Sequence, residues 1–139
     1  MDKILVSACL VGCTCRYDAK LKTNDKVMDL AKDNVLIPVC PEQLGGLPTP
    51  RHPSERVKDK VLRDDKVDVT KEYTLGAETA VKIAQLNQVD YCVMKSGSPA
   101  CGCGLIYDGT FTGKKIPGDG LATEYLKKAG FNVKTEEDL

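Results

Sequence analysis

The stretch ILVSACLVGCTCRYD, residues 4–18, starts as a buried strand and ends in a cluster of thiols. Its apolar start is a short continuous run, which is typical of a strand covered on both faces of a parallel sheet. Cys9, Cys13 and Cys15 follow directly after it. We therefore expect the first strand of a parallel sheet to carry a thiol-rich segment at its carboxyl end.

Outward from this stretch, strand and helix patterns alternate along the chain. The apolar runs that predict strands are KILVSACL (3–10), VLIPVC (35–40), YCVM (91–94) and FNVK (131–134). The segments that predict helices are 25–32, 70–88 with Thr70 as N-cap, and 120–130 with Gly130 as the stop. This alternation predicts one α/β domain over residues 1–139, with a small, mainly parallel sheet flanked by helices in a Rossmann-like or flavodoxin-like arrangement.

Two β-hairpins are expected to be inserted into this α/β pattern. The first spans residues 56–70, with its turn at Asp64-Asp65. The second spans residues 105–113, where Asp108-Gly109 is a strong turn signal between two apolar segments.

Charge and hydropathy argue against nucleic acid as a partner, against a membrane span and against secretion. The chain has 20 basic residues, 20 acidic residues and one histidine, so it lacks the excess of positive charge that binding to nucleic acid polymers requires. No apolar run approaches the roughly 18 residues of a membrane span, and Asp2 argues against a secretory leader. We therefore expect a cytoplasmic protein, in which the seven cysteines do not form a disulfide framework.

Three cysteines are expected to meet at one edge of the sheet. Cys9 ends the first predicted strand, Cys40 ends the second, and Cys101 lies in the loop after the third. Ligands of open parallel sheets bind at the carboxyl ends of the strands, where the strand order reverses. If the first strand lies between the second and the third, the three thiols face one crevice and form a soft-ligand site.

The other cysteines have several interpretations. Cys92 lies inside an apolar strand and is expected to be a small apolar filler of the core. Cys13 and Cys103 are either spare loop thiols or alternative ligands. Cys15 is a fourth ligand, a nearby redox partner or a structural residue.

The loops beside these thiols supply candidate catalytic groups. Glu42 follows Cys40 by two residues in a segment that holds five of the seven prolines, and its carboxylate is either an acid or base or a helix-capping or solvated group. The loop SGSPACGCG (96–104) offers backbone N–H groups and the hydroxyls of Ser96 and Ser98 to an anion or to cluster sulfur. His52 is the only histidine, so a histidine-rich metal site is excluded.

The cysteine spacing favours an iron–sulfur cluster over zinc. Structural zinc sites usually contain paired C-x₂₋₄-C ligands that close a tetrahedron, whereas this chain has C-x₃-C, C-x-C and long gaps. Clusters accept thiolates from distant loops. Zinc remains the alternative cofactor, and the absence of C-x₂-C speaks against a thiol-disulfide oxidoreductase.

At these residues the chain resembles a known family along nearly its whole length. The matching blocks are SACLVGCTCRYDAKLK (7–22), LIPVCPEQLGGLPTPRHPSE (36–55), DVTKEY (68–73) with GAE (76–78), SGSPACGCGLIYDGTFTGK (96–114) and GDGLATEYLKKAGF (118–131). They are similar to a bacterial domain family, formerly of unknown function, whose characterised members are thiouracil desulfidases. The segment CPEQLGGLPTPR is highly specific for this family.

The resemblance implies a [4Fe-4S] cluster held by three cysteines, whose fourth iron takes the sulfur of a thiolated pyrimidine. Carried over by position, the ligands are Cys9, Cys40 and Cys101, with Cys15 as the rival. The implied reaction is non-redox: 2- or 4-thiouracil, as base or nucleoside, becomes the oxo base and sulfide is released. Glu42 and Ser98 are implied to handle protons and substrate, and the implied pocket residues are Arg16, Tyr17 and Asp18. The alternative for Arg16 and Asp18 is a structural ion pair.

The chain departs from the family pattern at three positions. Ala19 stands where a glycine usually follows CRYD, Cys13 is additional, and Cys103 replaces a small polar residue. Two other functions stay open at this stage: a sulfur carrier that holds the cluster without turnover, and a structural zinc module. In both the thiols would hold loops or sulfur instead of taking part in hydrolysis. The sequence leaves the oligomeric state and the natural substrate open.

Overall fold

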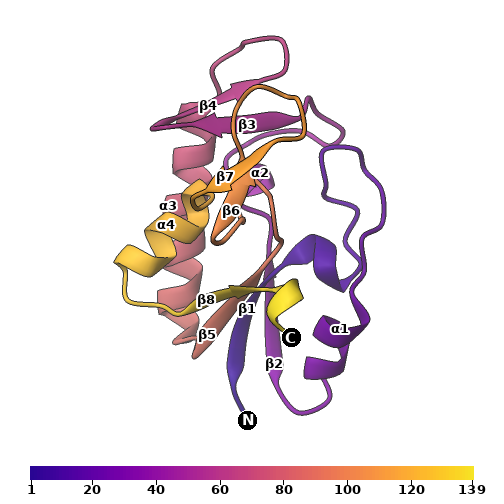
Figure 1. Cartoon of the computed structure of the whole chain (residues 1–139). Helices are drawn as coiled ribbons and strands as arrows, with labels where there is room; N and C mark the ends of the chain where they lie inside the picture. Colours follow the sequence, from indigo (N-terminus) through magenta and orange to yellow (C-terminus); the bar gives the residue numbers. More distant parts are fainter.

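The computed structural model describes all residues from 1 to 139 and has a parallel sheet at its centre (Figure 1). The strands of this sheet are β1 (Lys3–Ser7), β2 (Val35–Val39), β5 (Tyr91–Met94) and β8 (Val133–Thr135). They lie in the order β2-β1-β5-β8, and every neighbouring pair is parallel. This order confirms the predicted α/β class and puts the first strand between the second and third predicted ones. It is the order with which a flavodoxin-like sheet begins.

Helices cover both faces of the sheet (Figure 1). Their bounds are α1 (Asp25–Leu30), α2 (Pro41–Leu44), α3 (Thr70–Asn87) and α4 (Leu121–Lys128), with 3₁₀ turns η1 (Ala8–Val11) and η2 (Glu136–Asp138). Along β1 the side chains alternate: Leu5 packs in the core beneath α3 and α4, while Ile4 and Val6 pack in the core beneath α1 and η1. The continuous apolar run of β1 is therefore buried on both sides. None of the helices is both long and apolar enough to span a membrane.

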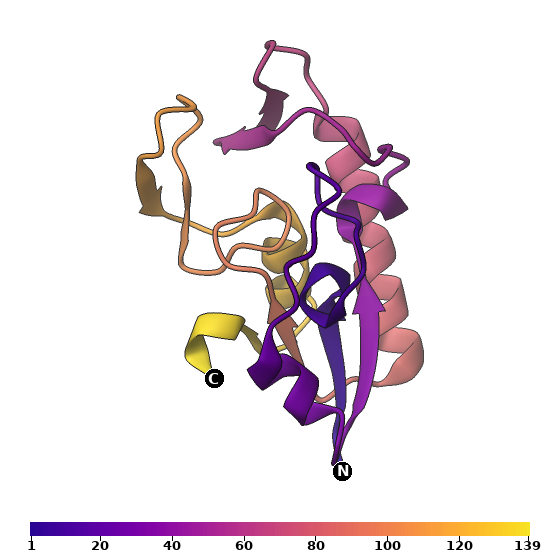
Figure 2. The same cartoon turned by 90° about the vertical axis from the view of Figure 1, so that its right-hand side faces the viewer.

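Two antiparallel hairpins stand beyond the carboxyl ends of the sheet strands (Figures 1 and 2). One consists of β3 (Ser54–Val57) and β4 (Lys60–Arg63), and the other of β6 (Leu105–Tyr107) and β7 (Lys115–Pro117). Together they form walls above the edge at which β1, β2 and β5 end.

The first hairpin turns earlier than the sequence predicted. Val57 pairs with Lys60, so the connecting residues are Lys58 and Asp59, not Asp64-Asp65. The side chain of Val61 is fully buried, and the burial of one strand face sets the pairing register. The chain also turns at residues 64–66, where the N–H of Arg63 donates to the carbonyl of Val67 at 2.9 Å. Asp64-Asp65 therefore forms the second of two turns.

Two local predictions also need correction. Thr70 is the first residue of α3 and Val69 is its N-cap, because the Thr70 hydroxyl accepts a hydrogen bond from the N–H of Val61 at 2.9 Å instead of capping the helix. Asp108-Gly109 does not form a two-residue turn. It begins the longer connection between β6 and β7, which the N–H of Asp108 closes by donating to the carbonyl of Lys114 at 3.0 Å.

Candidate active site

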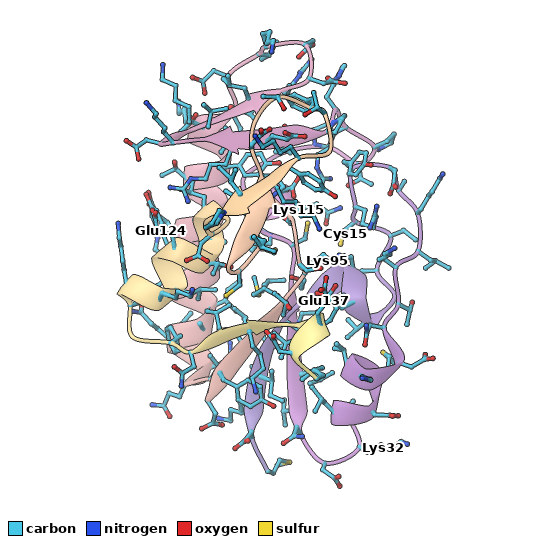
Figure 3. All side chains as sticks on the ribbon, viewed as in Figure 1. Cys15, Lys32, Lys95, Lys115, Glu124 and Glu137 are labelled. Carbon is cyan, nitrogen blue, oxygen red and sulfur yellow. The ribbon has the colours of Figure 1, made fainter.

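A pocket of about 340 Å³ opens where β1, β2 and β5 end, beneath the two hairpins. Four thiols line it, those of Cys9, Cys15, Cys40 and Cys101. Figure 3 shows Cys15 and Lys95 in this region, between the sheet and the hairpins. Soft sulfur donors that converge on one cavity suit a thiophilic metal or an iron–sulfur cluster.

The parallel sheet brings these cysteines together. Cys9 lies in η1 immediately after β1, and Cys40 is the N-cap residue of α2 immediately after β2. Cys101 lies in the loop that follows β5. The carboxyl ends of parallel strands share one edge, so three segments far apart in sequence meet there.

The remaining cysteines lie outside the pocket. Cys92 is fully buried in the core beneath α3 and α4. Cys13 is exposed, and the half-buried Cys103 thiol donates to the carbonyl of Val133 at 3.5 Å. The two extra thiols of this chain, Cys13 and Cys103, therefore do not line the cavity.

The four pocket thiols differ in their electrostatic surroundings. A hydrogen bond from the Cys15 thiol, the N–H of Gln43 and the Arg51 guanidinium together lower the pKa of Cys40 to about 7, although burial opposes the shift. Burial raises the pKa of Cys9 to about 11 and also raises the pKa of Cys101. Thiols bind metals as thiolates, because the metal replaces the proton.

Cys15 and Cys40 are neighbours in the pocket: the Cys40 thiol donates to the backbone carbonyl of Cys15 at 3.7 Å. The ligands of one cubane bind different irons. Cys15 and Cys40 could therefore both hold the same cluster only if their sulfurs reached different irons. Cys15 thus stays the rival ligand that the sequence predicts.

The loop that carries Ser98 and Cys101 is held by its own hydrogen bonds. The Ser98 hydroxyl oxygen accepts from the N–H groups of Ala100 at 3.1 Å and Cys101 at 3.0 Å. Since the oxygen accepts twice, the hydroxyl proton is the part left to act on another group. The buried Thr123 hydroxyl donates to the carbonyl of Cys101 at 2.9 Å, which ties the loop to α4.

A network that the sequence analysis missed supports the same loop from the other side. The Glu136 carboxylate accepts hydrogen bonds from the N–H of Ser96 at 2.7 Å and from the Ser96 hydroxyl at 2.9 Å, and it forms an ion pair with the Lys95 ammonium at 3.1 Å. Lys95 lines the pocket, and its charge counteracts the raised pKa of Cys9. The signal for this contact was available, because β8 was predicted as a parallel strand and Glu136 follows it at the shared edge.

Glu42 lies in the first turn of α2 and lines the pocket. Its Oε1 atom accepts from Arg51 Nε at 3.0 Å and from the Tyr73 hydroxyl at 2.8 Å. Arg51 and Tyr73 were not among the residues singled out in the sequence. Glu42 is thus neither a helix cap nor a freely solvated group; it is a paired carboxylate at the cavity wall.

The CRYD segment contributes two lining residues, Arg16 and Tyr17. The Asp18 carboxylate does not line the pocket and instead accepts two hydrogen bonds from Arg16, both of 3.1 Å. The Arg16 guanidinium lowers the pKa of Asp18 to about 2. Arg16 and Asp18 therefore form the structural ion pair that was the alternative prediction for them.

His52 lies at the surface, outside the pocket, as its loop position predicts. Its Nδ1 atom is 2.8 Å from Asp64 Oδ1, and Asp65 lies nearby. These exposed side chains are separate from the thiol cavity.

Comparisons with known proteins agree with one another. Residues 4–138 match the model of the 2-thiouracil desulfurase family. The uncharacterized protein YbbK of Bacillus subtilis (strain 168) is 38% identical over a 146-residue alignment that covers 98% of this chain and 97% of YbbK. The solved structure of a [4Fe-4S]-dependent thiouracil desulfidase, TudS, superposes with a TM-score of 0.94 at 39% identity, over 100% of this chain and 93% of that one. The chain belongs to the 2-thiouracil desulfurase family.

Proposed function

We propose that this protein is an enzyme that replaces the sulfur of a thiolated pyrimidine, a 2- or 4-thiouracil-like base or nucleoside, with oxygen and releases sulfide. The observation that carries the proposal is the meeting of four thiols and the Glu42 carboxylate in one cavity. Family membership and the 39% identity to TudS support it. All seven cysteines are unpaired, which suits the reducing cytoplasm that we propose as its compartment.

The donor set fits a [4Fe-4S] cluster better than it fits zinc. Cys9, Cys40 and Cys101 come from three different strand ends and would hold the cluster, with Cys15 as the rival for one place. Held by three thiolates, such a cluster would supply one iron without a protein ligand, and that iron would act as a Lewis acid toward sulfur.

The side chains of the pocket account for the remaining chemistry. Replacement of C=S by C=O consumes one water and yields hydrogen sulfide, so the atoms balance and no electron is transferred. Glu42 accepts a proton from the attacking water. Ser98 donates its free hydroxyl proton to the ring or to the negative charge that develops on it. Arg16 and Tyr17, at the wall of the same cavity, contact the substrate.

Anaerobic turnover tests this proposal directly. The cluster-loaded protein should convert 2-thiouracil or 4-thiouracil to uracil, followed by absorbance and by sulfide release, at the same rate with and without a reductant. A strict requirement for stoichiometric reductant would refute the hydrolytic mechanism. If the loaded protein leaves thiolated bases and nucleosides unchanged, it is a sulfur carrier or structural module.

The role of Glu42 is tested by Glu42→Gln, with Glu55→Gln as a matched control. Both carboxylates line the pocket, but Glu55 accepts from the N–H groups of Gly109 and Phe111, which a glutamine oxygen also accepts. Glu42→Gln should retain the cluster spectrum and slow turnover by roughly 10²- to 10⁴-fold, the usual contribution of an acid–base group. If only Glu55→Gln is slow, the proton acceptor is Glu55.

A further inference from the structure

The two carboxylate oxygens of Glu42 have different surroundings. Oε1 accepts both hydrogen bonds, from Arg51 and from Tyr73, whereas Oε2 has no donor in the protein. Oε2 is also not enclosed, since the one enclosed side-chain oxygen or nitrogen without a partner belongs to Glu72. Because Glu42 lines the pocket, Oε2 is the oxygen that a bound water or substrate can reach.

The Arg51 partner is itself held in one orientation. Its side chain is 6% exposed, and all five of its N–H donors have an acceptor. Besides Glu42, these acceptors are the carbonyl of Pro48 at 3.0 Å, Thr49 Oγ1 at 2.9 Å, the carbonyl of Cys15 at 2.8 Å and Cys40 Sγ at 4.0 Å. The guanidinium therefore links the Glu42 carboxylate to two thiol-bearing segments.

The Tyr73 partner comes from α3 and is 2% exposed. Its hydroxyl donates to Glu42 Oε1 at 2.8 Å. Burial raises the pKa of Tyr73, so this hydroxyl stays a proton donor. Helix α2 approaches α3 so closely that a Cβ on Gly76 would lie 1.8 Å from the carbonyl oxygen of Pro41. The donor and its acceptor thus sit on two helices in direct backbone contact.

We propose that Tyr73, together with Arg51, is a positioning residue for the desulfuration reaction: it holds Oε1 of Glu42 so that Oε2 faces the reacting carbon and its water. The inference rests on the proposed function, because it takes Glu42 as the proton acceptor. Tyr73 itself exchanges no proton with the substrate. Its contribution is to orientation, and a misplacement of about 1 Å at a reacting group can cost about 100-fold in rate.

The test is Tyr73→Phe in the cluster-loaded enzyme, which removes one hydroxyl and keeps the ring. We expect kcat to fall about 10-fold, with KM within about twofold, because the substrate contacts remain. Iron content, sulfide content and the visible spectrum should match those of the parent. Tyr125→Phe is the control, since Tyr125 packs against the same core and its hydroxyl makes no hydrogen bond; it should leave kcat unchanged.

A second variant separates positioning from a general loss of structure. If Tyr73 acts through Glu42, Tyr73→Phe combined with Glu42→Gln should be no slower than Glu42→Gln alone. The same two substitutions should lower the urea midpoint of unfolding by less than the sum of their separate effects. This second readout does not depend on turnover.

The outcomes distinguish the inference from the function on which it rests. The positioning role is overturned if kcat is unchanged in Tyr73→Phe. It is also overturned if the rate losses of Tyr73→Phe and Glu42→Gln multiply in the double variant. In both cases Glu42 remains the base. Full turnover in Glu42→Gln overturns the assignment of the base and the inference with it. A slow Tyr73→Phe and a double variant equal to Glu42→Gln support both.

Discussion

The substitution Glu136→Gln removes the charge that fastens the C-terminal segment to the loop after β5. In the native protein the carboxylate is 9% exposed, receives two hydrogen bonds from Ser96 and forms an ion pair with the Lys95 ammonium. A glutamine keeps one acceptor oxygen, which can still serve Ser96. Its amide NH₂ group replaces the other oxygen and faces a hydrogen-bond donor that it cannot accept from. Lys95, whose side chain is 19% exposed, then loses its charged partner and keeps only its hydrogen bonds to the carbonyl and hydroxyl oxygens of Ser96.

The size of the effect follows from these contacts. Hydrogen bonds to charged groups contribute about 1.5–3 kcal/mol each, and breaking a buried ion pair by removing one partner costs about 3–5 kcal/mol. Partial retention of the Ser96 contact reduces the loss. We expect the free energy of unfolding to fall by about 3 kcal/mol, which corresponds to a Tm lower by roughly 10 °C for a chain of this length.

Urea unfolding at neutral pH measures this difference, and Glu137→Gln is the matched control. Glu137 is the adjacent carboxylate, it is exposed, and its side chain makes no hydrogen bond (Figure 3). The control should lie within about 0.5 kcal/mol of the parent. Equal midpoints for Glu136→Gln and the parent, or an equal loss in the control, would refute the reasoning.

The loss of stability in Glu136→Gln should also depend on pH. Burial raises the pKa of Glu136, but the Ser96 donors and the Lys95 ammonium outweigh burial, so the net shift is downward. A carboxyl whose pKa is lower in the folded state contributes fully above its unfolded pKa of about 4.3 and loses that contribution as the pH falls through the folded value. The gap between parent and Glu136→Gln should therefore be constant near neutrality and shrink below about pH 4.

Two further predictions concern the ligands and the helix contact. Substitution of a proposed ligand by serine, at Cys9, Cys40 or Cys101, should abolish the brown colour of the anaerobically isolated protein. It should also abolish the content of about four irons. Cys92→Ser should keep both, and loss of iron in Cys15→Ser but not in Cys101→Ser would move the third ligand. Gly76→Ala should lower the unfolding free energy by about 2 kcal/mol or more despite the better helix propensity of alanine, because its Cβ would lie 1.8 Å from the Pro41 carbonyl oxygen. Chemical denaturation measures the last effect, and a stabilised variant would contradict it.

The order of elements and the meeting of three thiols were predictable from local patterns. Each strand of the parallel sheet shows itself as a short apolar run, and the long helices α3 and α4 show themselves as apolar stripes. The short helix α2 lies where a proline-rich loop was predicted. Once Cys9, Cys40 and Cys101 are placed after parallel strands, geometry brings them to one edge. For the elements themselves the determining information lies within a few residues of each, so the sequence by itself determined them. The meeting of the thiols also required β1 to lie between β2 and β5, which the sequence left open.

The turn of the first hairpin and the surroundings of Glu42 depended on tertiary structure. Asp64-Asp65 has strong turn chemistry, but burial of Val61 moved the hairpin turn to Lys58-Asp59. Glu42 and Tyr73, which are 31 positions apart in the sequence, come into contact only because α2 packs on α3. No local window encodes that approach, since it results from the packing of whole elements against one core.

The Ser96–Glu136 contact shows most clearly what local sequence determines and what tertiary structure determines. In the sequence by itself each residue follows a predicted strand by two positions. Their hydrogen bond, across 40 residues of chain, required β5 and β8 to be neighbours in the sheet. Strand neighbours are chosen by the burial of both sheet faces at once. The tertiary structure therefore decided which side chains surround the thiols, because that choice is a property of the whole core.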